Sequence, residues 1–141
     1  MQTSQAGLEF IARNEGFRPQ IYNDNGKPAI GYGHDLLPGE SFPNGITTLQ
    51  ARLLQEEDVA KIDALMAHLV PPDCTQNQWD ACADFAYNLG LVPLGTMLAH
   101  GWDQVPVQML RWDHKKNTQG IEVVDADLTA RRQAEVALFN S

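Results

Sequence analysis

The chain has 141 residues, of which 43% are hydrophobic and 20% charged, so one domain can bury a core without disulfides or metals, and intrinsic disorder is excluded. It carries 10 lysines and arginines against 18 aspartates and glutamates, and the net charge of −8 argues against a surface that binds nucleic acid. No apolar run could span a membrane, and the N-terminus lacks the basic and apolar regions of a secretory signal, so we expect no stable membrane insertion.

The first elements are predicted from their boundary residues. Ser4 can cap an amphipathic helix over residues 4 to 15. Beyond it, Ile21-Tyr22 and Ile30 to Tyr32 have the composition of strands. Asn25-Gly26 between them is a strong hairpin signal, because both residues tolerate positive φ. We therefore predict a small antiparallel sheet.

A long helix is predicted next. A capping box at Thr47 to Gln50 marks its start, and Pro71-Pro72 ends it. Over residues 47 to 69 such a helix is on the order of 34 Å long. Apolar residues recur along it at helical spacing: Leu49, Leu53, Val59, Ile62, Leu65, Met66 and Leu69.

The rest of the chain has helical patterns. A second capping box at Thr75 to Gln78 starts one helix, shorter helices are expected at about 94 to 100 and 104 to 113, and Asp127 or Thr129 caps the last. The fold class is therefore α+β, with a cleft between two lobes as the natural place for a site. The predicted single domain, 1–141, has a sheet lobe at about 14–45, an interlobe helix at about 47–69, and a helical lobe at about 73–141 together with helix 4–15.

Glu15 and Asp24 are the candidate catalytic pair. Glycoside hydrolysis needs one carboxyl group that donates a proton and a second that stays ionised. The negative end of the first helix and the neighbouring Phe17 should raise the pKa of Glu15, while Asp24, in a polar turn, should stay ionised. The spacing alone leaves open that Glu15 is a solvated helix-end residue and Asp24 an ordinary turn residue.

The sequence predicts no metal site and no cofactor. The four histidines, His34 among them, are scattered without the spacing of metal ligands. Cys74 and Cys82 lie too far apart for a CxxC motif, so we expect reduced thiols packed as small apolar groups.

Three motifs in order resemble the catalytic signature of the phage-type lysozymes, the endolysin muramidases of glycoside hydrolase family 24. They are Glu15-Gly16-Phe17-Arg18, Tyr22-Asn23-Asp24 and Ile30-Gly31-Tyr32-Gly33-His34. The likeness continues to residue 139. It implies a lysozyme-like two-lobed fold and a monomeric muramidase that cleaves the β-1,4 bond between N-acetylmuramic acid and N-acetylglucosamine of peptidoglycan. With no signal peptide, such a chain would be released from the host cytoplasm to the cell wall, or act in the virion or by another secretion route.

The resemblance assigns roles residue by residue. Glu15 takes the position of the general acid and Asp24 that of the second carboxylate. The family's third catalytic residue is a threonine that helps to hold the attacking water, and its position here is Ala29. The other matched positions are those of substrate-binding residues, Tyr32, Asn88 and Arg131, and of a structural pair, His34 and Asp58.

Alternatives remain for several of these positions. A methyl group cannot hydrogen-bond a water, so Ala29 also fits a lysozyme-fold module that binds or scaffolds glycan with little or no turnover. If hydrolysis survives, restoring a hydroxyl at Ala29 should raise turnover with little effect on stability, because the position is expected to border the open cleft. Arg131 could instead be an exposed charge at a helix end, and Asn88 could cap the helix before Gly90.

Overall fold

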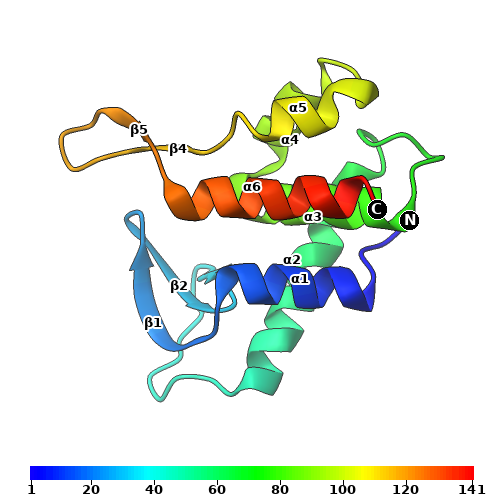
Figure 1. The fold of residues 1–141 in the computed structure, drawn as a ribbon. Helices are drawn as coiled ribbons and strands as arrows, with labels where there is room; N and C mark the ends of the chain where they lie inside the picture. The colour runs from blue at the N-terminus through cyan, green and yellow to red at the C-terminus, as the bar shows by residue number, and fades with distance from the viewer.

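A computed structural model describes residues 1–141 and has the predicted α+β class (Figure 1). Helix α1 leads into a three-stranded antiparallel sheet in the order β1-β2-β3, and α2 connects this sheet to a mainly helical lobe. The bounds of the first half are α1 Gln5–Glu15, β1 Arg18–Asp24, β2 Lys27–Gly31, β3 His34–Asp35 and α2 Thr48–Met66. Those of the second half are α3 Gln76–Leu89, α4 Leu91–Leu98, η1 Trp102–Gln104, α5 Val105–Met109, β4 His114–Lys116, β5 Glu122–Val124 and α6 Ala126–Phe139.

The predicted first helix and hairpin are confirmed. The Ser4 side chain caps α1 by accepting a hydrogen bond from the backbone N–H of Gly7. Asn25 and Gly26 connect β1 to β2 with positive φ values of 50° and 89°, as a tight hairpin requires. The two-residue strand β3, which pairs with β2, has no signal of its own in the sequence.

Helix α2 begins as predicted, with both hydrogen bonds of the Thr47–Gln50 capping box formed. It ends at Met66, three residues earlier than expected, and its 19 residues span about 28 Å. Its apolar residues do not mark the buried face, because Leu49, Leu53 and Leu65 are exposed. The residues that α2 buries are Ala51, Gln55, Val59, Asp63 and Met66.

Two of those buried α2 residues are polar, and each has specific partners. The Gln55 amide donates to the backbone oxygen of Leu8. Asp63 accepts hydrogen bonds from Thr3 and from the Trp79 indole, the latter at 2.8 Å. These bonds fix α2 against α1 and α3, and they explain why a face with two polar residues is the buried one.

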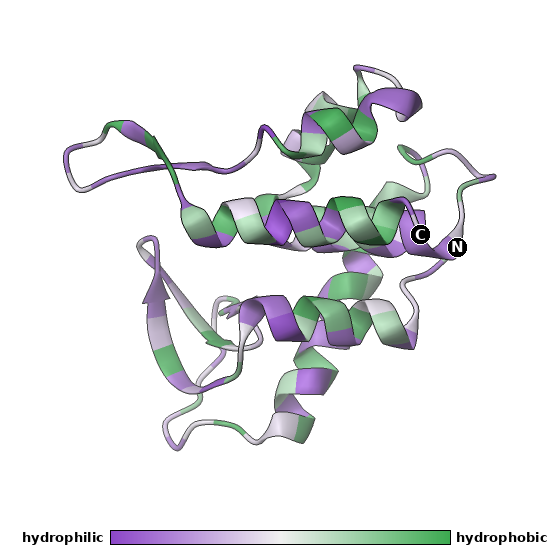
Figure 2. Cartoon of the chain, in the orientation of Figure 1, coloured by the Kyte–Doolittle hydropathy of each residue, from purple (hydrophilic) through white to green (hydrophobic).

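Helix α3 is the centre of the helical lobe, and eight consecutive residues of it, 79 to 86, are buried. It lies beside α6, as Figure 1 shows, and α1 also contacts it. The outer faces of α1 and α6 alternate between hydrophilic and hydrophobic residues (Figure 2). Cys74 and Cys82 are buried free thiols, as expected.

Predictions for the end of the chain need correction. Helix α4, at 91–98, begins and ends earlier than expected, whereas α5, at 105–109, begins one residue later and ends four residues earlier than expected. Asp125, rather than Asp127 or Thr129, caps α6 by accepting a hydrogen bond from the backbone N–H of Leu128. The β4–β5 hairpin was not predicted at all. No helix of the chain is both long and apolar enough to cross a membrane.

Candidate active site

A polar cavity of about 310 Å³ lies between the sheet and the helical lobe. Glu15, the last residue of α1, and Asp24, the last residue of β1, both line it, so two elements bring the predicted carboxylates to one space. The other lining residues are Arg18, Tyr22, Asn25, Gly33, Asp35, Tyr87 and Asn88.

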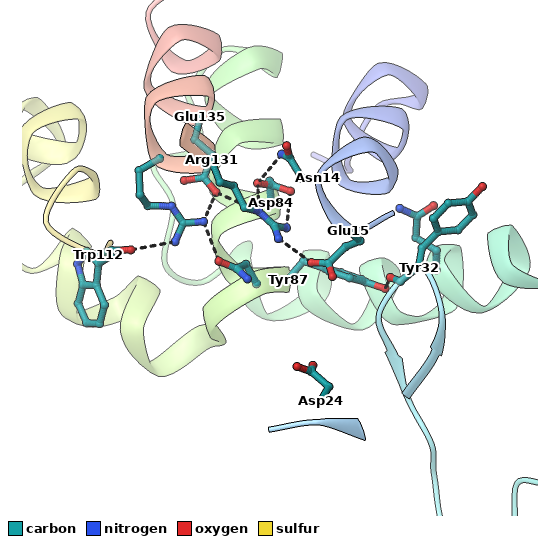
Figure 3. A network of polar contacts seen from close by, with 12 residues as sticks. Asn14, Glu15, Asp24, Tyr32, Asp84, Tyr87, Trp112, Arg131 and Glu135 are labelled. Atoms are coloured by element: carbon teal, nitrogen blue, oxygen red, sulfur yellow. Dashed lines mark hydrogen bonds and ion pairs between the residues drawn. The ribbon is translucent and has the colours of Figure 1, made fainter. Parts of the chain in front are cut away.

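Glu15 is held at the cavity wall by the helical lobe. Its side chain is 17% exposed, and its Oε1 accepts a hydrogen bond from Nη1 of Arg131 at 2.8 Å (Figure 3). On its other side, a Cβ on Gly33 would lie 2.6 Å from Oε2 of Glu15, so only glycine leaves room for the carboxylate. The structure therefore excludes the alternative that Glu15 is a solvated helix-end residue.

Arg131 of α6 is itself anchored by Asp84 of α3. Two parallel hydrogen bonds, from Nε and Nη2 of Arg131, reach the two carboxylate oxygens of Asp84 at 2.9 and 2.8 Å. The Asp84 side chain is fully buried and also accepts a hydrogen bond from Asn14. The Arg131 side chain is only 9% exposed, so it is not an exposed charge at a helix end.

Burial is the main reason that the pKa of Glu15 is raised above its usual 4.5. Arg131 lowers the pKa through its charge and its hydrogen bond, but this effect is smaller than that of burial. The predicted direction is therefore correct, whereas the predicted cause, the helix end and Phe17, is not the dominant one.

A second buried pair lies behind Arg131. The guanidinium of Arg132 contacts Glu135 at 2.5 Å, and both side chains are fully buried. Three carboxyl groups, Glu15, Asp84 and Glu135, thus share two guanidinium groups, so one retained proton makes the cluster neutral. Burial raises the pKa of Glu135 as well as that of Glu15. Only Glu15 lines the cavity, so only its proton can reach a ligand there.

Asn88 lines the cavity, and its side-chain oxygen accepts a hydrogen bond from Nη2 of Arg132 at 2.9 Å. This bond leaves the amide N–H₂ group without a protein partner, so it can donate to a ligand. The helix stop at Gly90 is made by the backbone N–H of Gly90, which donates to Ala86, so Asn88 is not needed as a cap.

Ala29 differs from expectation. It is fully buried and does not line the cavity, so it does not border the open cleft.

Tyr32, predicted to bind substrate, also does not line the cavity. Its ring packs against Phe17, with the centroids 5.5 Å apart, and the guanidinium of Arg52 lies over it. Two other tyrosines, Tyr22 and Tyr87, line the cavity in its place.

His34 joins the sheet to α2. Its Nδ1 lies 2.6 Å from Oδ2 of Asp58, and its Nε2 lies 2.9 Å from Oε1 of Glu40, a partner that the sequence did not suggest. Burial works to lower the pKa of His34, but the hydrogen bonds to the two carboxylates raise it overall. No group of three or more His, Cys, Asp or Glu side chains is arranged to hold a metal ion.

Comparisons with known proteins identify the family of the chain. The family model of phage lysozyme matches residues 12–135. An endolysin of Acyrthosiphon pisum secondary endosymbiont phage 1 is 31% identical over 148 residues, which cover 100% of this chain and 99% of that protein. Endolysins of two Bacillus and two Lactococcus phages match 99 to 100% of this chain, which spans 54 to 61% of their length.

Solved structures share the whole fold. An endolysin from Escherichia coli O157:H7 phage FAHEc1 matches with a TM-score of 0.86 and 29% identity, over 99% of this chain and 93% of that one. The muramidase domain of SpmX from Asticaccaulis excentricus has the same TM-score at 30% identity, over 99% and 98% of the two chains. This chain belongs to the phage lysozyme family and is a glycosidase.

Proposed function

We propose that the chain hydrolyses the β-1,4 bond between N-acetylmuramic acid and N-acetylglucosamine in peptidoglycan, with Glu15 as the general acid and Asp24 orienting the attacking water. The observation that carries this proposal is Glu15 itself, a carboxyl group with a raised pKa at the wall of a cavity that Asp24 also lines. Similarity to proteins described as endolysins and as a muramidase supports the same substrate.

The contact between Arg131 and Glu15 suits a general acid. Burial raises the pKa of Glu15 and so favours its protonated form, which can give the proton to the glycosidic oxygen as the bond to C1 breaks. The carboxylate that then forms accepts a charge-assisted hydrogen bond from Arg131, which is already in place at 2.8 Å. Asp24 is exposed and its only side-chain contact is with Asn25 at 3.4 Å, so its carboxylate is free to bind a water.

The cavity continues in a direction that suits a polymer. A second cavity of about 470 Å³ shares Asn25 and Asn88 with the first, and extends along β4 past His114 to Lys116. A glycan strand could therefore occupy both. We propose that peptidoglycan is the only macromolecular partner, that the chain acts as a monomer without a cofactor or nucleic acid, and that it reaches the wall after release from the host cytoplasm.

Digestion of purified peptidoglycan by the parent and by Glu15→Gln tests the proposal. The variant should lose about a hundredfold to ten-thousandfold in the release of reducing ends, the usual contribution of a general acid. Glu9→Gln is the matched control, since Glu9 lies exposed on the same helix and away from the cavity. Digestion by Glu15→Gln at the parent's rate would show that Glu15 is not the acid.

Glu15→Gln should leave thermal stability unchanged or raise it. A raised pKa means that the folded protein holds the Glu15 proton more tightly than the unfolded chain does. Ionisation of Glu15 therefore lowers stability as pH rises from 4.5 through the folded pKa, and glutamine removes that loss.

A glycan-binding module without turnover is the second candidate function, and the observation that favours it is Ala29, which has no hydroxyl to hold a water. Binding of intact peptidoglycan with no release of reducing ends would favour it.

A further inference from the structure

We propose that Asp35 of β3 positions the attacking water together with Asp24, in place of the hydroxyl that Ala29 lacks. This inference rests on the proposed hydrolysis. It starts from the cavity, which has a third carboxylate, Asp35, that neither the catalytic pair nor any hydrogen bond or ion pair of the fold uses.

The strand register places Asp35 beside Ala29. Ala29 of β2 pairs directly with Asp35 of β3 on one side and with Tyr22 of β1 on the other. Directly paired residues of antiparallel strands have their side chains on one face, with Cβ atoms about 4.5 to 5.5 Å apart. Asp24 follows Tyr22 by two residues and so projects from the same face. Asp24, Ala29 and Asp35 therefore share one face of the sheet.

That face is the one that forms the cavity. Tyr22, Asp24 and Asp35 line it, whereas Ile30 on the opposite face packs with Ile46 and Ala51. Burial is the main reason that the pKa of the Tyr22 hydroxyl is raised, and the charges of Asp24, Glu15 and Asp35 raise it further. The charges of all three carboxylates are therefore felt at the Tyr22 hydroxyl.

The backbone on both sides of Asp35 is fixed. The preceding residue, His34, is bound by Asp58 and Glu40, and the following residue, Leu36, donates its backbone N–H to Pro28 at 3.0 Å. The carboxylate of Asp35 is itself exposed and has no protein partner. Its oxygens lie one bond farther from the backbone than a threonine hydroxyl would, which helps it to reach the water from the neighbouring strand.

The chemistry needs two acceptors. In the proposed step the water oxygen bonds to C1, the bond from C1 to the glycosidic oxygen breaks, and the Glu15 proton passes to that oxygen. One O–H of the water points to Asp24, which takes the proton, and the other points to Asp35, so that a lone pair faces C1. The fixed orientation is what the second acceptor adds to catalysis.

Steady-state hydrolysis of soluble peptidoglycan fragments by Asp35→Ala, which removes the acceptor, tests this role. We expect kcat to fall about tenfold to a hundredfold, as expected for one lost transition-state hydrogen bond, with KM within about twofold of the parent. Asp73→Ala, which removes an exposed carboxylate in a loop away from the cavity, should leave kcat unchanged. Thermal unfolding of each variant shows whether it is folded.

A conservative variant separates this role from a structural one. Asp35→Asn keeps a side-chain oxygen that accepts a hydrogen bond, and it should retain most of the kcat that Asp35→Ala loses. An unchanged kcat in Asp35→Ala overturns the inference, and so does a rise in KM alone, which would make Asp35 a sugar-binding residue. Both outcomes leave the parent an active muramidase. A parent that releases no reducing ends overturns the inference and the proposed hydrolysis together.

Discussion

Arg131 and Glu15 lie 116 residues apart in the chain, and 2.8 Å separates Nη1 of Arg131 from Oε1 of Glu15. The contact joins α6 to the end of α1 across the helical lobe. Because Asp84 holds the other edge of the same guanidinium, the position of Glu15, the proposed general acid, depends on three helices packing correctly.

Arg131→Met should destabilise the fold. It leaves the fully buried carboxylate of Asp84 without its cation, and breaking a buried pair in this way costs about 3 to 5 kcal/mol in the free energy of unfolding. Urea unfolding measures this loss. The double variant Arg131→Met with Asp84→Asn should recover part of it, because residue 84 then has no charge that needs a cation. Arg111→Met, at an exposed arginine, is the control, and an equal effect of both single variants would contradict the prediction.

The two carboxylates proposed for catalysis could be located from the sequence, but their environment could not. Glu15 and Asp24 lie in short local motifs, whereas burial of Glu15 arises from α6 and α3, which are remote in the chain. Asp84 was missed, although it had one signal: a charged residue within the apolar stretch 81–86 of a central helix needs a partner.

The misplaced elements have physical reasons as well. Helix α2 buries Gln55 and Asp63 instead of its leucines because those polar groups meet backbone and indole partners from other elements. Asp125 and Thr129 can both cap a helix, but Thr129 instead donates to Asp113 at 3.0 Å. Long-range partners of this kind leave no periodic signal, and neither does a two-residue strand such as β3.

The two contacts of His34, with Asp58 and with Glu40, form a clamp between the sheet and α2. This clamp predicts a stability that depends on pH. The folded pKa of His34 is raised, so its contribution is complete below 6.5 and is lost as pH rises through the folded pKa. The pKa of Glu40 is lowered, chiefly by the backbone N–H of Leu37, so its contribution is complete above 4.5 and is lost as pH falls through its folded pKa. The clamp is therefore fully formed between pH 4.5 and 6.5.

Unfolding of His34→Gln across pH checks this prediction. The variant should lose most stability within that window and show a flatter pH profile above it. His68→Gln replaces an exposed histidine in the turn that follows α2 and should keep the parent's profile. If His34→Gln and the parent have parallel profiles from pH 6 to 8, the titrating group is not His34.

Ala29→Thr should lower stability, in contrast to the expectation from the sequence. Ala29 is fully buried, so the two added heavy atoms must displace neighbours, and overpacking of this kind costs about 1 to 3 kcal/mol. Ala29→Ser adds one heavy atom and should cost less. Urea unfolding of both variants ranks them, and a threonine variant as stable as the parent would mean that the site opens to the cavity in solution.

Gly33→Ala should misplace Glu15, the proposed general acid. Gly33 has φ +77°, and an added Cβ would lie 2.6 Å from Oε2 of Glu15, so the carboxylate must move. A displacement of about 1 Å at a reacting group can cost about a hundredfold in rate. Gly39→Ala is the matched control, because Gly39 has a similar φ of +86° with nothing within 4 Å of the added Cβ. Both variants should lose about 1 to 2 kcal/mol of stability from backbone strain, but only Gly33→Ala should lose turnover on peptidoglycan. Equal turnover in the two variants would show that the Gly33 contact does not set the position of Glu15.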